Sequence, residues 1–195
     1  ASRLTILTSG TTGRPKGAQR AVGGPDVLGV VASVLHRLRL RSGDPLLVGV
    51  PLFHGYGFAL SILAFVLGSP LVLRRRFDPE DAMRAVAEHR VAVLAVVPVM
   101  LQRLLALPDD PAARASLRAV LSGAAPLDPA LATRALDAWG DVLFNGYGSS
   151  EVGIATVATP ADLRDDPGSV GRPVLGATVR VVDEVGVTTP IGVTG

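Results

Sequence analysis

Apolar and polar residues follow one another along the chain in blocks that predict strands and helices in turn. Short apolar runs without polar alternation are typical of strands buried on both faces of a sheet. Between these runs, apolar residues recur at helical spacing. We expect strands at residues 4–7, 46–50, 71–73, 91–97, 117–121 and 142–144, and helices at residues 25–40, 58–67, from 79, 98–107 and 129–139.

Helix start signals support this order. Asp78 precedes Pro79, and Asp128 precedes Pro129, so in each case an acceptor for free backbone N–H groups stands before a proline at the first helical position. Strands that alternate with helices predict an α/β fold with a parallel sheet flanked by helices. In such sheets, ligands bind beyond the carboxyl ends of the strands.

The pattern changes at Gly153. From there the chain shows shorter β-rich pieces, with strands expected at residues 154–158 and 178–182, separated by loops rich in Pro, Gly and Asp. We therefore predict two units, an α/β subdomain over residues 1–152 and the start of a smaller β-rich subdomain, truncated, over residues 153–195.

One segment calls for a membrane test. Residues 46–73 carry no formal charge, and this run is longer than the roughly 20 residues that a spanning helix needs. Prolines and glycines interrupt it, however, and the longest helical piece, residues 58–67, is too short to cross a bilayer. A buried strand, loop, helix and strand is the interpretation we prefer to a transmembrane segment.

Composition narrows the function classes. Charged residues make up 18% of the chain, against about 25% in a typical soluble domain, which suggests that some of its surface is normally covered by another part of a larger protein. A net charge of +2 gives no reason to expect nucleic-acid binding. There is no cysteine and no signal-peptide pattern at the start, so we expect a cytoplasmic protein.

A loop rich in glycine and hydroxyl groups follows the first strand. It reads Thr-Ser-Gly-Thr-Thr-Gly-Arg-Pro-Lys-Gly over residues 8–17. Glycines let backbone N–H groups approach an anion, and the hydroxyls and the ammonium of Lys16 add further donors, so the loop suits a polyphosphate. A flexible turn is the plain alternative.

Lysine usage argues against that alternative. The chain has 18 arginines and a single lysine, Lys16, within this loop. A lone lysine suggests a task that needs a compact point charge rather than a planar fork. The loop is not a Walker A motif, because Arg14 and Pro15 separate Gly13 from Lys16 and Gly17 stands where that motif has Ser or Thr.

Two further loops come where the sheet rule predicts a site. Residues 122–127, Ser-Gly-Ala-Ala-Pro-Leu, follow one strand, and residues 145–151, Asn-Gly-Tyr-Gly-Ser-Ser-Glu, follow the next. Small residues let a flat ring lie on the backbone, Tyr147 offers an aromatic face and Asn145 can pair with a base edge. Glu151 offers an oxygen ligand for a hard cation such as magnesium. Taken singly, each is equally consistent with a turn or a surface acid.

These motifs together resemble the adenylate-forming (AMP-binding) superfamily, in particular acyl-CoA synthetases of the fatty-acid–CoA ligase type. The loop at residues 8–17 is similar to that family's phosphate loop, residues 123–126 to its adenine-contacting segment and residues 147–151 to its Y-G-x-[ST]-E signature. Residues 51–57, Pro-Leu-Phe-His-Gly-Tyr-Gly, and 168–173, Gly-Ser-Val-Gly-Arg-Pro, look like two more family segments. The motifs occur in the family's order and span nearly the whole chain.

The resemblance implies a role for each site residue. The phosphates of ATP would be held by Thr8, Ser9, Gly10, Thr11, Thr12, Gly13 and Lys16. The adenine would be cradled by Gly123, Ala124, Ala125, Pro126, Asn145 and Tyr147, and Gly146 and Gly148 would also contact the nucleotide. Ser150 would contact the α-phosphate, and Glu151 would bind Mg²⁺. His54 would border the acyl and thiol side, with a packed or capping histidine as its alternative. Residues 1–152 would then form the nucleotide-binding subdomain.

The implied activity is that of an acid–thiol ligase, with ATP, Mg²⁺ and coenzyme A as cofactors and co-substrates. A carboxylic acid, which we expect to be a fatty acid, would attack ATP to give an acyl-adenylate and pyrophosphate, and coenzyme A would then take the acyl group. An adenylation domain loading a carrier protein is the alternative with the same chemistry. A P-loop-type ATPase and a non-catalytic nucleotide-binding or interaction module are the alternatives from other classes.

The chain also departs from that family. Its members carry a second lysine in a small carboxy-terminal domain and an aspartate that holds the ribose, and we find neither here. We therefore expect a central fragment of the large amino-terminal domain that packs on the missing domains and is not competent alone. The expected partners are ATP, the acid and coenzyme A, without nucleic acid or a transmembrane segment.

Overall fold

The computed structural model describes residues 3–8, 16–21, 25–149 and 152–195. In chain order its elements are β1 (Arg3–Thr8), β2 (Lys16–Ala21), α1 (Pro25–Arg37), β3 (Leu46–Val48), α2 (Gly55–Val66), β4 (Leu71–Leu73), α3 (Pro79–Glu88), β5 (Val93–Val96), α4 (Pro98–Leu104), β6 (Ala119–Gly123), α5 (Pro129–Trp139), β7 (Leu143–Ser149), β8 (Gly153–Ala158), α6 (Pro160–Asp165) and β9 (Arg172–Pro173).

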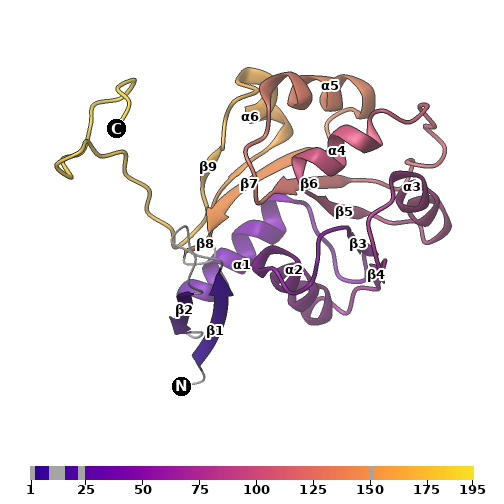
Figure 1. Cartoon of the computed structure of the whole chain (residues 1–195), viewed down its shortest axis with the longest axis horizontal. Coiled ribbons are helices and arrows are strands. Elements are labelled where there is room, and N and C mark those ends of the chain that lie inside the picture. Colours follow the sequence, from indigo (N-terminus) through magenta and orange to yellow (C-terminus); the bar gives the residue numbers. More distant parts are fainter. Residues whose placement is uncertain (1–2, 9–15, 22–24, 150–151) are drawn as a thin grey trace.

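The main sheet has seven strands in the order β4-β3-β5-β6-β7-β8-β9 (Figure 1). The pairs β4–β3, β3–β5, β5–β6 and β6–β7 are parallel, whereas the pairs β7–β8 and β8–β9 are antiparallel. The predicted α/β fold with a parallel sheet flanked by helices is confirmed, with the addition that the sheet becomes mixed at β8. Strands β1 and β2 form a separate antiparallel hairpin.

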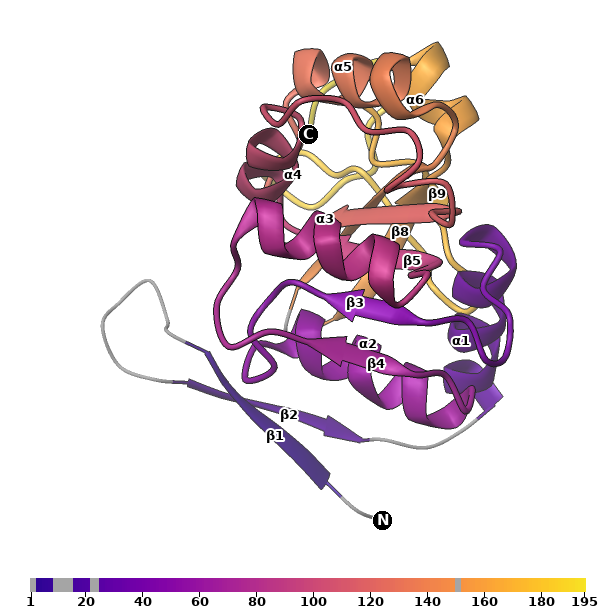
Figure 2. The same ribbon diagram turned by 90° about the vertical axis from the view of Figure 1, so that its right-hand side faces the viewer.

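Helices cover the sheet on both faces (Figure 2). One buried core joins α3, α4, α5 and α6 to the sheet, and a second core joins it to α1 and α2. Because both faces are covered, the central strands have no polar alternation: every residue of β5 and of β6 is buried. This explains why the continuous apolar runs in the sequence located the strands.

The predicted helix caps are present. The Asp78 carboxylate accepts a hydrogen bond from the backbone N–H of Asp81, and the Asp128 carboxylate accepts one from that of Leu131. Helix α5 has the predicted bounds. Helix α1 ends at Arg37, three residues earlier than predicted, because Arg39 adopts a positive φ of 52°. The N–H of Leu40 then bonds back to the carbonyl of Leu35 and closes the helix.

Other differences lie towards the two ends of the chain. The strand predicted at residues 178–182 is wrong, because only an isolated bridge between Val182 and Thr188 forms there and no neighbouring strand lies alongside in the described part of the chain. Strands β2 and β9 and helix α6 were not predicted. Helix α6 begins with a capping box between Thr159 and Asp162, a signal that the sequence carries.

The sheet continues past the predicted subdomain boundary. Strand β8 pairs with β7, and Arg37 of α1 donates hydrogen bonds to the carbonyls of Val157, Arg172 and Pro173, which fastens β8 and β9 to the rest of the sheet. The chain leaves the sheet after Val174 and extends away from it (Figure 1). A boundary between residues 152 and 153 stays a prediction.

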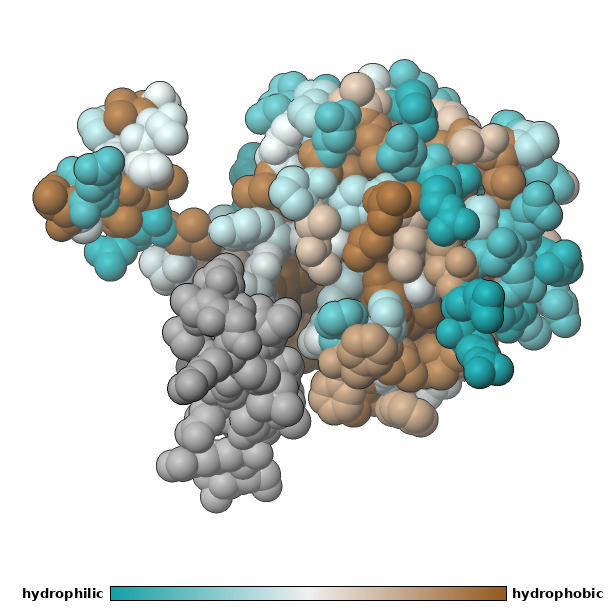
Figure 3. Space-filling model, viewed as in Figure 1, coloured by the Kyte–Doolittle hydropathy of each residue, from teal (hydrophilic) through white to brown (hydrophobic). Residues whose placement is uncertain are grey.

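Apolar side chains are exposed over α2 (Figure 3). Phe58, Ile62, Phe65 and Val66 project from this helix, and Phe53 lies just before it with 80% of its surface exposed. A contiguous apolar patch of this kind is typical of a surface that contacts another molecule or domain. Among the described residues, no helix is both long and apolar enough to cross a membrane.

Candidate functional site

Residues from two of the predicted loops meet where β6 ends against β7. In the parallel pairing of these strands, Ser122 stands opposite Asn145 and Gly123 opposite Gly146. A loop does follow β6 after Gly123, but the loop predicted from Asn145 is wrong over residues 145–149, because these residues continue β7 and pair with β8. The carboxyl end of β6 remains the edge at which ligands bind in such sheets.

Tyr56, in the first turn of α2, supports the carboxyl end of β6. Its hydroxyl donates a 2.8 Å hydrogen bond to the carbonyl of Leu121, and a Cβ added at Gly123 would lie only 3.5 Å from its ring carbon Cζ and 3.3 Å from the carbonyl oxygen of Gly146. Burial raises the pKa of the Tyr56 phenol, so it stays protonated and donates. Tyr56 lies within the family-like segment 51–57, but no sequence pattern indicated this supporting role.

The loop after β6 is locally strained. Ala124 has a φ of +63°, a left-handed conformation that costs an ordinary residue about 1–2 kcal/mol. Two residues before it, in β6, the buried hydroxyl of Ser122 has no hydrogen-bond partner in the part of the chain that the structure describes. Strain and an unmatched polar group often cluster at functional sites. Residues 124–126 are exposed, so their backbone is open to a ligand.

Asn145 is buried, with 6% of its surface exposed, and its side-chain nitrogen donates a 3.3 Å hydrogen bond to the carbonyl of Ser169. The family-like segment at residues 168–173 is thereby held against β7. The hydroxyl of Thr156 also donates to the carbonyl of Val170. One N–H of Asn145 is thus already used within the protein, a structural role that the sequence did not indicate.

The hairpin between β7 and β8 explains one of the predicted glycines. The register shifts between Tyr147 and Gly148, and a Cβ at Gly148 would lie 1.8 Å from the carbonyl oxygen of Gly153. Gly148 is therefore required by the close approach of two backbone segments. Tyr147 lies on β7 beside this register shift and is 56% exposed, so its ring is open to a ligand. Gly146 has no contact that would exclude a Cβ.

His54 stands at the N-cap position of α2, two residues before Tyr56. Its side chain makes no capping hydrogen bond, and its ring is exposed and lies 4.6 Å from the ring of Phe53, centroid to centroid. These observations argue against a packed or capping histidine. Because Tyr56 reaches Leu121, the segment that carries His54 lies beside the carboxyl end of β6.

The predicted phosphate loop connects the two strands of the β1–β2 hairpin. Thr8 and Lys16 are paired across this hairpin, and Leu7 is paired with Gly17. The predictions for Ser9, Gly10, Thr11, Thr12 and Gly13 lie outside the described residues, as do those for the side chains of Thr8 and Lys16.

Ser150 and Glu151 also lie outside the described residues, so the α-phosphate and magnesium roles stay predictions. Among the described residues, no group of three His, Cys, Asp or Glu side chains could hold a metal ion.

Comparison with known proteins agrees with this arrangement. A family model described as AMP-binding enzyme matches residues 4–195. A 2-succinylbenzoate–CoA ligase from Bacillus pumilus is 33% identical over 187 residues, which cover 95% of this chain and 37% of the relative. A feruloyl-CoA synthase from an Amycolatopsis species is 35% identical over 195 residues, 98% of this chain and 39% of the relative.

Among solved structures, the o-succinylbenzoate CoA synthetase MenE from Bacillus subtilis, in complex with its acyl-adenylate intermediate, is similar with a TM-score of 0.82 and 27% identity. The match covers 95% of this chain and 37% of that one. The chain thus spans less than two fifths of the length of each of these proteins.

Proposed function

The chain belongs to the AMP-binding enzyme family, and from this we propose that it holds the ATP site for activating a carboxylic acid to an acyl-adenylate, with release of pyrophosphate and transfer of the acyl group to coenzyme A. The observation that carries the proposal is the parallel pairing of β6 with β7, which places Gly123, at the start of the segment 123–126, opposite Gly146. The segments 123–126 and 145–148 hold the residues assigned to the nucleotide, and the family model covers both.

The adenine would lie on the exposed backbone of Ala124, Ala125 and Pro126 and against the ring of Tyr147. Tyr56 keeps this surface in place through its hydrogen bond to Leu121. Glycine at position 123 leaves room for the two strands and the Tyr56 ring to meet. The strained loop is therefore held by the Tyr56 phenol, which bonds to Leu121, and by the pairing of β6 with β7.

The reaction needs no general base, because a carboxylic acid is already ionised at neutral pH. The carboxylate oxygen bonds to the α-phosphorus of ATP, and the bond from that phosphorus to the bridging oxygen of pyrophosphate breaks. Lys16, the loop hydroxyls and Ser150 would position the phosphates in line and stabilise the charge on the leaving group. Glu151 offers a carboxylate suited to Mg²⁺, which when bound neutralises phosphate charge.

We propose an acid with an aromatic ring as the substrate, in place of the fatty acid expected from the sequence. The support comes from the relatives, whose names specify 2-succinylbenzoate and feruloyl groups. A panel of aromatic and fatty acids tests the choice, because acid-dependent pyrophosphate release would be faster with the favoured class. Faster release with long-chain fatty acids would restore the original expectation.

Coenzyme A is the proposed acceptor, since both relatives are named for coenzyme A products. His54 and the exposed Phe53 ring would border the path by which the thiol approaches. A carrier protein is the second candidate. Offering coenzyme A and a phosphopantetheinyl carrier in parallel separates the two, because only the true acceptor should discharge the adenylate.

We further propose that this chain does not complete the transfer by itself. Its single lysine is already assigned to the phosphate loop, so nothing in the chain supplies the second lysine of the family. The apolar patch over α2 would pack on the other domains of the whole enzyme. Thioester formation by this chain alone would overturn the proposal that the transfer needs the other domains.

The test of the proposed function is whether ATP cleavage depends on the acid, measured in an enzyme that carries all its domains. We expect this enzyme to release pyrophosphate only when acid is present, and we expect Lys16→Ala to lose that release. Release of phosphate without any acid would instead support an ATPase. Binding of ATP with no cleavage, in an enzyme that carries all its domains, would support a non-catalytic nucleotide-binding module.

A further inference from the structure

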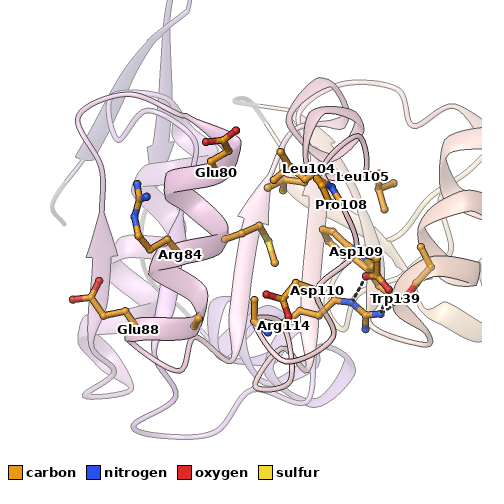
Figure 4. Close-up of a pocket in the computed structure, with 15 residues that line it drawn as sticks. Glu80, Arg84, Glu88, Leu104, Leu105, Pro108, Asp109, Asp110, Arg114 and Trp139 are labelled. Atoms are coloured by element: carbon orange, nitrogen blue, oxygen red, sulfur yellow. Dashed lines mark hydrogen bonds and ion pairs between the residues drawn. The ribbon is translucent and has the colours of Figure 1, made fainter.

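A hollow lies on the face of the molecule that carries α3, α4 and α5 (Figure 4). It has a volume of about 690 Å³ and is formed by α3, the end of α4, the loop that leads to β6, and the end of α5. This loop and the end of α5 lead into the amino ends of β6 and β7. The nucleotide loops leave the carboxyl ends of the same strands, so the two sites lie at opposite edges of the sheet.

The floor of the hollow is apolar. Met83 and Trp139 are partly buried against the core beneath it, and Leu104 is almost fully buried. Ala87 and Pro108 add further apolar surface. A hollow of a few hundred cubic ångströms with a mainly apolar lining is the usual form of a binding site.

The rim, in contrast, is charged, and its cations are already paired. Arg114 contacts the carboxylate of Asp109 at 3.1 Å and the carbonyl of Ala138 at 2.9 Å. Arg84 pairs with Asp81 at 2.9 Å. Both guanidinium groups of the rim thus already have a carboxylate partner, which makes an anionic ligand less favoured here than a cationic one.

Unlike the two arginines, three of the rim carboxylates have no ion-pair partner among the described residues. Within the part of the chain that the structure describes, Glu80, Glu88 and Asp110 have no cationic partner, although one oxygen of Asp110 caps the backbone of the loop. Four carboxylates against two guanidinium groups leave the lining with a charge of −2, on a chain whose net charge is +2. An apolar floor with an acidic rim is complementary to a cationic, amphipathic partner.

We propose that this hollow is a docking site for a polypeptide segment in which apolar side chains are flanked by lysine or arginine. The apolar side chains lie on Met83 and Trp139, and the basic groups reach Glu80, Glu88 and Asp110. Recognition of this kind follows the helix-in-groove pattern, with charge at the edges selecting the partner. The site would bring a basic partner protein to the enzyme without covering the nucleotide loops.

The chain provides its own reporter, because Trp139 is its only tryptophan. The probe is a ten-residue peptide of leucine and lysine in helical spacing, titrated against the protein while Trp139 emission is recorded. A peptide with glutamate in place of lysine is the control for charge. We expect saturable binding of the basic peptide, weakened at high salt, and no binding of the acidic one.

Variants locate the binding. Glu80→Gln with Glu88→Gln should weaken the basic peptide at least fivefold. The matched control, Asp165→Asn with Glu184→Gln, removes two exposed carboxylates elsewhere and should change the affinity less than twofold. Ala87→Phe fills the floor without changing the charge and should also abolish binding. Circular dichroism confirms that each variant is folded.

Several results would overturn the proposal. If the control variant weakens peptide binding as much as Glu80→Gln with Glu88→Gln, the loss of affinity reflects the net charge of the protein and not the rim of the hollow. Equal binding of both peptides would show that the acidic rim does not select a basic partner. No saturable binding by the folded protein would show that the hollow is not a docking site for such a segment. Binding of 2-phenylethylamine as tightly as the peptide would indicate a small ammonium ligand instead. Trp139 emission that changes with protein concentration alone, together with self-association in sedimentation, would indicate a second copy of the chain.

Discussion

The hydrogen bond from Tyr56 to the carbonyl of Leu121 is the contact by which the α2 layer supports the nucleotide loop, and Tyr56→Phe removes only this bond. The ring stays, so its packing under Gly123 is kept. What is lost is a 2.8 Å hydrogen bond to a carbonyl on a buried residue. Leaving a buried acceptor without its donor costs about 1–2 kcal/mol.

Urea unfolding followed by circular dichroism measures this loss. With a slope of about 2 kcal/mol per molar, the midpoint should fall by about 0.5–1 M. The chain offers a matched control, because it has one other tyrosine, Tyr147, which is largely exposed. Tyr147→Phe makes the same chemical change at the surface and should alter stability by less than about 0.5 kcal/mol.

The same variant should weaken ligand binding. If the phenol holds the end of β6, Tyr56→Phe should lower the affinity for an acyl-adenylate analogue. A midpoint in Tyr56→Phe that equals the one in Tyr147→Phe would refute the account of Tyr56 as a support. Lower stability with unchanged affinity would confine its role to folding.

The raised pKa of Tyr56 predicts how the stability of the fold changes in alkaline solution. Burial raises the pKa of this phenol above its unfolded value of about 10, so the folded state keeps a proton that the unfolded state has lost. The stability is therefore complete below that pH and decreases as the pH rises further. Ultraviolet absorbance should show tyrosinate from Tyr56 appearing together with unfolding, and its appearance in the folded protein near pH 10 would contradict this.

Three further predictions concern single residues. Gly148→Ala should disrupt the β7–β8 hairpin and lower the melting temperature strongly, because its Cβ would lie 1.8 Å from a carbonyl oxygen, whereas Gly146→Ala should be tolerated. Ala124→Gly should stabilise the protein by up to about 1 kcal/mol in urea unfolding, since glycine accepts the positive φ, and no gain would show that this loop is not strained. Burial would raise the pKa of Asp162, but hydrogen bonds from Thr159 outweigh it and hold the pKa low, so this carboxylate stabilises the fold at neutral pH and loses its effect as the pH falls below about 4. Asp162→Asn should therefore reduce the acid dependence of the melting temperature, and an unchanged acid limb would count against that pairing.

The sequence was sufficient for the parts of the fold that depend on local or periodic signals. The apolar runs at β5 and β6 and the proline-led helix α5 were located because burial on both faces and capping leave a direct mark on residue type. The strand predicted at residues 178–182 failed because pairing needs a neighbour, which no local pattern reports. The early end of α1 depends on the backbone angle of Arg39, a residue type that rarely signals a left-handed turn.

For the site, motifs named the loops but not what holds them. The glycines at 123 and 146 were expected to meet a ligand, and the pairing of β6 with β7 brought them together. The support from Tyr56 and the tether from Asn145 to Ser169 join residues that are far apart in the chain. Contacts of this kind arise from the fold as a whole, so no spacing rule in the sequence could have predicted them.

The most direct test of the central claim is calorimetric titration of the folded chain with magnesium-ATP and with a non-hydrolysable acyl-adenylate analogue. The account predicts weak, saturable binding of the analogue that decreases in both Lys16→Ala and Glu151→Ala and is unchanged in Glu184→Ala, an exposed acid in the carboxy-terminal segment. Equal binding in all three variants, or no binding by a chain that circular dichroism shows to be folded, would contradict the claim that these loops form one adenylate site.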